Sequence, residues 1–353
     1  MNIQENVPLS AHSTMQLGGP ARYLADIASR NDLTEALTWA AQKQLPVMMI
    51  GTGSNIIWGD KGFAGLVLVN KITGFEIQDI DASSKYLIVG GGENWDSVVA
   101  RAVEQGLSGI ELLSRIPGTA GAAPVQNIGA YGAQLSDVLV TLETYDLQAN
   151  KFVTLMAADC AFGYRTSRFK SADKGRFFIT GITIRLEHGM AQPPYYRDIQ
   201  AYIEQNKVTD ITLASLRDIV SHIREKKLPD PRIIPNTGSF FQNPIISKEA
   251  YQTIVENHPQ IEKAPMGWSQ PPRWFLDNEQ VKLSAGWLVE QAGFKAYEDK
   301  ETGMATWPYQ NLVLTNKGAH STADLLKFKQ KIIDAVQAKF GVALVQEPEL
   351  IGA

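Results

Sequence analysis

Arg115-Ile-Pro-Gly-Thr-Ala-Gly-Ala-Ala-Pro-Val-Gln-Asn-Ile-Gly-Ala-Tyr-Gly-Ala-Gln134 is the stretch that says most about the fold of this chain. From Ile116 onward it has no charged residue, and alanines separate its four glycines, which are Gly118, Gly121, Gly129 and Gly132. Glycine permits positive φ and has no Cβ to keep a ligand away from the main chain. Such a run suits a chain that lies against a flat or phosphate-bearing cofactor and binds it with main-chain N–H groups. The alternative is a tight surface loop, which the scarcity of Ser and Asp argues against.

The size and composition of the chain fit a globular protein of two or three domains. It has 353 residues, of which 44% are hydrophobic and 20% charged, and a net charge of −4. Nucleic-acid binding usually needs a basic excess, so the charge gives no general case for it. Cys160 stands alone, which excludes an internal disulfide framework and fits a reducing compartment. The sequence shows no signal-peptide pattern and no apolar run of membrane-spanning length, and it predicts a cytoplasmic protein.

The first third of the chain reads as alternating strands and helices. Ser29 and Asp32 open a helix with capping-box-like spacing, and a second helix carries Trp95 and ends at Gly106. Strands are predicted at 46–50, 56–58, 65–70, 75–80 and 86–89. No Gly-x-Gly-x-x-Gly opens a helix after a strand here, which argues against a Rossmann dinucleotide domain.

The later part continues with both kinds of element. Strands are predicted at 138–145, 177–185, 311–315 and 342–350, and helices at 213–226 and around Trp287. Ser321 or Thr322 caps a further long helix, which runs to Phe340 and ends at Gly341.

Six sequence blocks follow one another in a fixed order. They are Gly-Thr-Gly-Ser-Asn at 51–55, Ile-Pro-Gly at 116–118 running into Gln-Asn-Ile-Gly-Ala-Tyr-Gly at 126–132, Phe-Gly-Tyr-Arg at 162–165, Gly-Ser-Phe-Phe-Gln-Asn-Pro at 238–244, Ala-Gly-Trp-Leu at 285–288, and Glu-Pro-Glu at 347–349. This order resembles that of the UDP-N-acetylenolpyruvoylglucosamine reductase family, flavoenzymes that make UDP-N-acetylmuramic acid for bacterial peptidoglycan. Within the family it resembles the type with a tyrosine-bearing substrate loop, and the resemblance covers nearly the whole chain.

The resemblance implies an α+β fold in two parts. One is an FAD-binding domain of the vanillyl-alcohol-oxidase (PCMH) type with two subdomains, and the other is a separate α+β substrate-binding domain. Residues 1–70, joined by the C-terminal strand at about 342–353, would form the first subdomain. Residues 71–205 would form the second subdomain, and residues 206–341 the substrate domain.

The activity implied is the NADPH-dependent reduction of UDP-N-acetylglucosamine enolpyruvate through enzyme-bound FAD. Hydride and then a proton are added across an enol-ether double bond, and negative charge develops beside a carboxylate. By the resemblance, Arg165 binds that carboxylate through its guanidinium fork. Glu349, rather than Glu347, is the catalytic carboxylic acid, whose protonated form can donate a hydrogen bond. Ser239 is the proton donor, a role that suits only a carbon as basic as an enolate.

Without the resemblance, the residues alone would suggest an ordinary structural role for each of these three side chains. Arg165 would be a surface ion-pair partner, Glu349 a solvated glutamate and Ser239 a turn or cap residue.

Contacts to FAD follow from the two glycine-rich loops. Gly51 to Asn55 offer amides and hydroxyls to a pyrophosphate, and the loop at 115–134 lies close to the cofactor by the resemblance. The expected contacts are Gly51, Thr52, Gly53, Ser54, Asn55, Gly118, Thr119, Ile128 and Gly129. No histidine occurs between His12 and His188, so a histidyl-flavin link has no candidate in this region and the FAD is expected to be noncovalent. Cys160 reads as a small buried thiol rather than an attachment point.

For the nucleotide part of the substrate, the resemblance points to Tyr196, Lys227, Asn243 and Gln291. The family usually has Tyr-Gly-Asp where this chain has Tyr195-Tyr196-Arg197-Asp198. The choice between the two tyrosines and the role of Arg197 therefore stay open. Lys227 ends a basic cluster that a helix C-terminus would favour by itself.

Three other kinds of function are less consistent with the sequence. The five histidines are scattered without ligand spacing, so no metal site is expected. An FAD oxidase of an alcohol or sugar is the rival on the same fold, but the separate module at 206–345 disfavours it. A flavin-binding protein without catalysis is disfavoured because Arg165, Ser239 and Glu349 occur together. The expected partners are the UDP-linked substrate and NADPH, with no nucleic acid, membrane or obligate protein partner.

Overall fold

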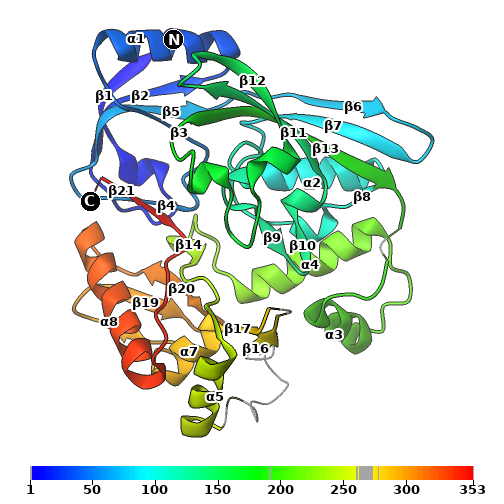
Figure 1. The fold of residues 1–353 in the computed structure, drawn as a ribbon, viewed down its shortest axis with the longest axis vertical. Coiled ribbons are helices and arrows are strands. Elements are labelled where there is room, and N and C mark those ends of the chain that lie inside the picture. The colour runs from blue at the N-terminus through cyan, green and yellow to red at the C-terminus, as the bar shows by residue number, and fades with distance from the viewer. Residues whose placement is uncertain (1, 191, 260, 262–272, 277, 353) are drawn as a thin grey trace. The chain divides into compact units, whose positions relative to one another are not determined.

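The computed structural model describes residues 2–190, 192–259, 261, 273–276 and 278–352. The chain packs into two compact units, which Figure 1 shows with their elements labelled. Unit 1 comprises Met1–Pro8, Pro20–Gly53 and Gly62–Arg224, and unit 2 comprises Leu9–Gly19, Ser54–Lys61 and Glu225–Ala353. Each unit is described by itself below.

The first sheet of unit 1 has the order β1-β2-β5-β3. Its strands are β1 (Ile3–Pro8), β2 (Pro20–Ile27), β5 (Phe63–Asn70) and β3 (Val47–Ile50); β1 is antiparallel to β2, and β5 is parallel to both β2 and β3. Helix α1 (Arg30–Gln42) buries Leu33, Ala36 and Ala40 against this sheet. The Ser29 side chain accepts the Asp32 N–H at 3.1 Å, which confirms the predicted helix start.

The second sheet of unit 1 is antiparallel and runs β12-β11-β13-β7-β6. These strands are β12 (Lys151–Met156), β11 (Leu139–Asp146), β13 (Phe177–His188), β7 (Ser84–Gly90) and β6 (Phe75–Asp79), with β8 (Leu107–Ser108) added beside β13. Helix α2 (Trp95–Glu104) buries Trp95, Val98, Val99 and Ala102 among residues of β7 and β13. The β6–β7 hairpin extends away from the rest of unit 1 in Figure 1.

The small-residue loop at 115–134 packs onto this sheet through its backbone. The Gly121 N–H donates to Gly91 O at 2.8 Å, and the Gly91 N–H donates to Thr180 O at 2.7 Å. A Cβ on Gly121 would lie 2.9 Å from the carbonyl oxygen of Ile179. Part of the glycine content of the loop therefore serves close main-chain packing. The short elements of this region are η2 (Glu111–Leu113), η3 (Ala123–Gln126), β9 (Gly129–Ala130), β10 (Ala133–Gln134), η4 (Leu135–Asp137), η5 (Ala157–Cys160) and η6 (Arg168–Lys170).

Helices α3 (Arg197–Asn206) and α4 (Leu213–Lys227) share one apolar cluster. Its buried members are Ile199, Leu213, Leu216, Ile219, Val220 and Ile223. Helix α4 is also tied to α2, because Arg217 Nη1 donates to Asp96 Oδ1 at 2.7 Å. By packing, most of α4 thus belongs to unit 1. The division of the chain into two FAD-binding subdomains (1–70 with about 342–353, and 71–205) and a substrate domain (206–341) stays a prediction.

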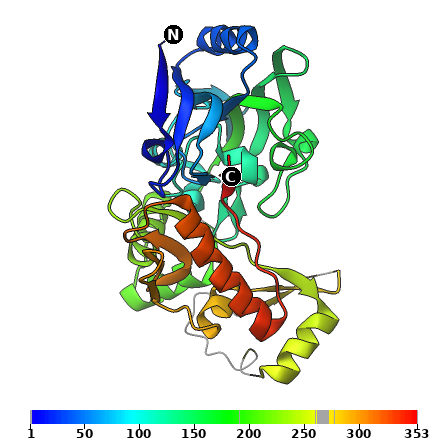
Figure 2. The ribbon, with the colours of Figure 1, turned by 90° about the vertical axis from the view of Figure 1, so that its left-hand side faces the viewer.

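Unit 2 is built on two antiparallel sheets with the orders β14-β20-β19-β18 and β15-β17-β16. The strands are β14 (Asn236–Ser239), β20 (Gln310–Asn316), β19 (Met304–Trp307), β18 (Glu298–Asp299), β15 (Ile245–Ser247), β17 (Gln280–Leu283) and β16 (Arg273–Phe275). The described helices of this unit include α5 (Lys248–Asn257), α7 (Ala285–Gln291) and α8 (Thr322–Phe340). Figure 2 shows α8, whose buried side chains join the core of the unit. The capping box of Ser321 with Asp324 and left-handed Gly341 confirm its predicted ends.

Two segments of unit 2 come from the first sixty residues of the chain. One contains η1 (Leu9–His12), and the other contains β4 (Ile56–Trp58), which pairs in parallel with β21 (Glu349–Ile351). The single strand predicted at 342–350 is wrong, because only its end is a strand. Pro348 has no N–H to donate, and Gln346 forms only an isolated bridge with Phe241.

Candidate active site

Three chain segments of unit 2 meet where Ser239 and Glu349 lie. The Glu349 N–H donates to Asn55 O at 3.0 Å, and the Glu347 N–H donates to Phe240 O at 2.8 Å. The Gln242 N–H donates to Val345 O at 2.9 Å. Main-chain hydrogen bonds thus bring together Asn55, the residue after Ser239, and the segment that ends in Glu349. Both predicted catalytic side chains of this unit are half-buried.

Ser239 ends a strand whose shape is set by Asn236. The pairing of β14 with β20 is irregular between these two residues, and Gly238 between them has φ 73°. The buried Asn236 amide accepts the Gly238 N–H at 2.8 Å and donates to Ile234 O at 2.8 Å and Pro229 O at 3.3 Å. The bulge turns the end of β14 and so fixes where the Ser239 hydroxyl is presented. Sequence reasoning did not identify Asn236.

Arg165 occupies a tight turn of unit 1. Gly163 and Thr166 exchange N–H···O bonds at 3.1 and 3.3 Å, which leaves Tyr164 and Arg165 at the tip. Arg165 has φ 54°, a left-handed conformation that non-glycine residues rarely adopt. Its Nη2 donates to Gly129 O at 2.8 Å, so the guanidinium lies against the small-residue loop. A Cβ on Gly129 would lie 3.3 Å from Arg165 Nη1, so this glycine leaves room for the guanidinium.

The glycine-rich loops of unit 1 offer a main-chain cradle of the kind that suits FAD. A Cβ on Gly51 would lie 2.5 Å from Thr119 Oγ1, so the two loops touch where only glycine fits. The Thr119 hydroxyl is buried and has no hydrogen-bond partner in the described chain. Such an orphaned hydroxyl beside glycines fits a bound group with polar oxygens. Gly118 has φ 127° and Gly53 φ 67°, backbone conformations that glycine adopts without strain.

The remaining predicted FAD contacts are divided between the units. Thr52 is exposed in unit 1, directly before buried Gly53, and Ile128 is buried in the core of the second sheet. Ser54 and Asn55 follow in the chain and belong to unit 2 by packing. Asn55 thereby joins the predicted cofactor loop to the segment of Glu349.

The single cysteine is the buried thiol that the sequence predicted. The Cys160 Sγ lies 3.3 Å from Met156 O, and burial raises its pKa to about 11. A thiol with this pKa is protonated at neutral pH and is a poor nucleophile.

Tyr196 stands at the start of α3, where it is the N-cap residue. Its ring packs edge-on against Tyr131 with 5.6 Å between centroids. Its hydroxyl is buried without a hydrogen-bond partner among the described residues, and burial raises its pKa. Arg197 is exposed at the first position of the helix.

The other predicted substrate residues lie on separate elements. Lys227 is the last residue of α4, and Gln291 is the last residue of α7. Asn243 lies between β14 and β15, and its Oδ1 accepts the N–H of Ala285, the first residue of α7, at 3.0 Å. Part of the Asn243 amide therefore has a structural task.

Sequence reasoning also missed Asn127. This residue is 1% exposed and left-handed at φ 48° and ψ 70°, and its amide contacts two segments of unit 1, at 134–136 and at Gly163. The signal was present in the quoted Gln-Asn-Ile-Gly block, because asparagine tolerates left-handed turns and bonds nearby main chain.

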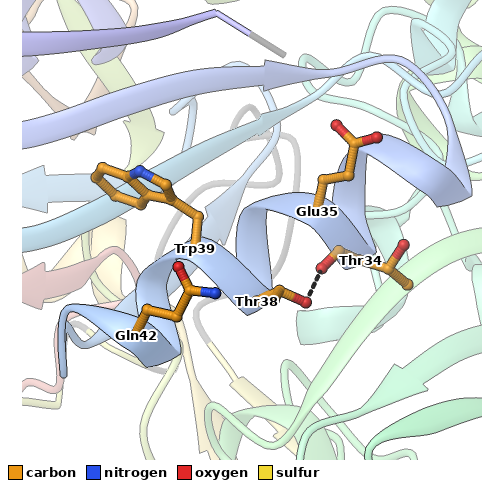
Figure 3. A pocket seen from close by; sticks show the side chains of 5 residues that line it. All are labelled: Thr34, Glu35, Thr38, Trp39 and Gln42. Atoms are coloured by element: carbon orange, nitrogen blue, oxygen red, sulfur yellow. Dashed lines mark hydrogen bonds between the residues drawn. The ribbon is translucent and has the colours of Figure 1, made fainter.

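Two surface hollows of unit 1 carry none of the predicted site residues. One, of about 350 Å³, runs along the outer face of α1 (Figure 3). Figure 3 shows its lining side chains Thr34, Glu35, Thr38, Trp39 and Gln42. The other, of about 380 Å³, lies on the face of the second sheet and is lined by residues such as Thr141, Glu143 and Thr180. In the described part of the chain, no helix has the length and apolar character needed to span a bilayer. The same residues contain no cluster of three or more side chains suited to hold a metal ion.

Known families match both parts of the chain. A model described as an FAD-binding domain matches residues 21–154, which include Gly51 and Thr119. A model described as the C-terminal domain of UDP-N-acetylenolpyruvoylglucosamine reductase matches residues 230–351, which include Ser239 and Glu349. The first match and the two-loop cradle define a flavin-dependent protein with the predicted α+β, PCMH-type FAD-binding fold.

Relatives extend the match over the full length. UDP-N-acetylenolpyruvoylglucosamine reductases of Ralstonia nicotianae and Cupriavidus pinatubonensis are 38% and 39% identical over 99% of both chains. The Thermobifida fusca enzyme is 36% identical over 99% of this chain and 98% of its own. The crystal structure of the Thermus caldophilus enzyme shares the fold, with a TM-score of 0.66 over 99% of each chain at 21% identity. The chain belongs to the UDP-N-acetylenolpyruvoylglucosamine reductase family, and its predicted class, a flavin-dependent oxidoreductase, is confirmed.

Proposed function

We propose that this protein reduces UDP-N-acetylglucosamine enolpyruvate to UDP-N-acetylmuramate in the cytoplasm, with bound FAD and with NADPH as the reductant. The observation that carries the proposal is the meeting of the Ser239 and Glu349 segments through the Glu347 N–H to Phe240 O bond. Full-length relatives that bear the name of this reductase support it.

The residues of unit 1 fit FAD as the cofactor. Gly51, Gly53, Gly118 and Thr119 would hold it, with the buried Thr119 hydroxyl supplying a polar contact. Bound FAD would supply hydride-transfer chemistry between NADPH and the substrate. The protonated Cys160 thiol favours a noncovalent cofactor.

Arg165 would bind the carboxylate of the enolpyruvyl group. One of its terminal nitrogens is fixed by Gly129 O, which orients the plane of the guanidinium before a substrate arrives. A fixed cation at this carboxylate stabilises the negative charge that develops during hydride addition. Glu349 would act as the catalytic carboxylic acid beside the same group of oxygens.

Ser239 would give its proton to the carbon that becomes carbanionic. A hydroxyl is a weak acid, so it transfers a proton only to a strongly basic carbon. The bulge at Gly238 and the Asn236 amide hold the strand end that carries this hydroxyl. A fixed donor avoids the cost of reorganising the site during the reaction.

Tyr196 would contact the diphosphate of the substrate, together with Lys227, the NH2 group of Asn243 and Gln291. Its hydroxyl is buried without a partner in the described chain, so a phosphate oxygen would supply the missing acceptor. Because burial raises its pKa, this hydroxyl stays a neutral donor over the physiological range. These features favour Tyr196 as the tyrosine that contacts substrate.

The test is an absorption experiment on the purified protein. We expect a yellow protein that loses its colour on anaerobic addition of NADPH and regains it on addition of UDP-N-acetylglucosamine enolpyruvate. Oxygen uptake with an alcohol or sugar, and no recovery of colour with the enolpyruvyl substrate, would instead identify an oxidase. A colourless protein that takes up no FAD would overturn both assignments.

A further inference from the structure

We propose that Asn127 is a positioning residue for Arg165. The proposal rests on the proposed function, in which the Arg165 guanidinium binds the substrate carboxylate. Asn127 lies in the small-residue loop of unit 1 and is 1% exposed. It would act through Arg165 without contacting the substrate.

The first step is that Asn127 holds the turn that carries the Arg165 backbone. Its Nδ2 lies 3.3 Å from Gly163 O, the carbonyl that also accepts the Thr166 N–H and closes the turn. Within this turn, Arg165 has a left-handed φ of 54°. Such a backbone is strained and persists only where surrounding contacts fix it. The Asn127 amide is one of those contacts.

The second step is that Asn127 also holds the hairpin that receives the guanidinium. Its Oδ1 accepts the Ser136 N–H at 2.9 Å, and its Nδ2 contacts Ser136 Oγ at 3.0 Å and Gln134 Oε1 at 3.2 Å. Strands β9 and β10 form this hairpin, and its Gly129 carbonyl accepts Arg165 Nη2 at 2.8 Å. Three acceptors surround the two amide hydrogens, so one hydrogen is shared between two of them.

The third step connects the turn that carries Arg165 with the β9–β10 hairpin. One side chain contacts the turn from which Arg165 departs and the hairpin on which its guanidinium rests. Loss of the NH2 group would release the turn from the hairpin while the Oδ1 bond to Ser136 remains. The guanidinium would then sample more positions, and its aligned two-bond contact with a carboxylate would be less populated.

The decisive experiment is a double-mutant cycle with Asn127→Asp and Arg165→Ala. Asp keeps the shape, the tolerance of left-handed φ and the acceptor to Ser136, but it removes the NH2 donor. Recovery of yellow colour by the enolpyruvyl substrate is measured in single turnovers, with FAD content and bleaching by NADPH as separate readouts. Asn127→Asp should slow the recovery about 10-fold in the wild-type background and less than about 2-fold in the Arg165→Ala background, because contacting residues that act together are not additive.

The outcomes separate the inference from the function on which it rests. Equal slowing in both backgrounds, or parallel losses of FAD and of bleaching, would show that Asn127 is merely structural and would overturn the inference. If Arg165→Ala alone leaves the recovery unchanged, the assigned role of Arg165 fails, and this single variant reveals it.

A matched control and a reserve variant complete the design. Asn150→Asp is the control, because Asn150 is also left-handed, at φ 53°, and uses its Oδ1 to accept the Tyr145 hydroxyl in another turn of unit 1. It should leave all three readouts within about 2-fold of wild type, as expected for changes that share no partner with the site. If Asn127→Asp does not fold, Asn127→Gly takes its place in the cycle, since glycine also adopts the left-handed backbone.

Discussion

The two units place their proposed catalytic groups in different ways. In unit 1, Arg165 is placed by side chains, because the Asn127 amide holds its turn and hairpin. In unit 2, main-chain bonds between three chain segments hold Ser239 and Glu349, and the Asn236 amide adds bonds only to main chain near it in the sequence. A main-chain bond survives most substitutions, whereas a side-chain hub is lost with one residue. The position of Arg165 should therefore be more sensitive to neighbouring substitutions than the positions of Ser239 and Glu349.

The largest expected effect comes from removing the proposed proton donor itself. Ser239→Ala should slow the recovery of yellow colour by substrate about 10²–10⁴-fold, the usual contribution of a positioned acid. FAD content and bleaching by NADPH should not change. Thr237→Val is the control on the same strand, because Thr237 is buried and valine keeps its shape, and this change should not slow turnover. Wild-type recovery in Ser239→Ala would remove Ser239 from the mechanism.

The next effect concerns the geometry of the cation in unit 1. Arg165→Lys keeps the charge but loses the planar fork that contacts Gly129 O and is proposed to bind the substrate carboxylate. We expect kcat/KM for the enolpyruvyl substrate to fall roughly 10- to 100-fold, which corresponds to about 1.4–3 kcal/mol of transition-state stabilisation. Steady-state kinetics measures this change. Full activity in Arg165→Lys would mean that charge alone suffices and that the turn geometry is irrelevant.

A smaller effect is expected from the ion pairs that follow Arg165 in the chain. Arg168 and Arg176 both pair with Asp173, and Arg176 also pairs with the buried Asp146. Hydrogen bonds from Arg176 lower the pKa of Asp146 from 3.8 to about 2. Because the folded pKa is the lower one, this stabilisation is present above about pH 4 and is lost as the pH falls through about 2.

Asp146→Asn should therefore lower the free energy of unfolding at pH 5 by about 2 kcal/mol. The difference from wild type should shrink as the pH falls from 4 to 2. Urea unfolding at several pH values measures it. Parallel curves for the two proteins over this range would contradict the assignment.

The smallest effect is expected beside the catalytic groups of unit 2. Gln346 Nε2 donates to Pro348 O at 2.8 Å, and Lys329 Nζ donates to Gln346 Oε1 at 3.1 Å. Because main-chain bonds already hold this segment, Gln346→Ala should change kcat by less than about 3-fold, the size typical of a substitution that leaves the principal contacts in place. A larger loss than that of Asn127→Asp would reverse the proposed contrast between the units.

The fold could be predicted from the sequence where one local signal determines the structure. Ser29, Ser321 and Gly341 mark helix ends through capping groups within four residues, and these predictions are confirmed. The first two strands carry no such signal, because their burial patterns depend on distant partners. The last strand was overextended because Val342 and Leu344 are buried in a core while their segment runs as an irregular chain.

Only those site residues that stand in recognisable sequence motifs could be predicted. Arg165, Ser239 and Glu349 stand in recognisable blocks, and the structure places the last two on adjoining segments of one unit. Asn127 was missed because its bond to Gly163 O, 36 residues further along the chain, appears only when two distant segments are brought together. The Asn236 side chain bonds only main chain within seven residues, but its main-chain N–H donates to Thr14 O at 2.9 Å.

The division of the chain into units bears on how the molecule is made. The polypeptide passes between the units after Pro8, Gly19, Gly53, Lys61 and Arg224. Residues 9–19 leave the ribosome early, but Met15 O accepts the side-chain N–H of Asn316, which is 301 residues later, at 3.4 Å. Translation must therefore approach completion before the second unit can close, and its exposed apolar residues must avoid aggregation until then. A fragment beginning at residue 225 would lack residues 9–19 and 54–61, which belong to the same unit. Neither unit can therefore be transferred to another protein as one continuous segment.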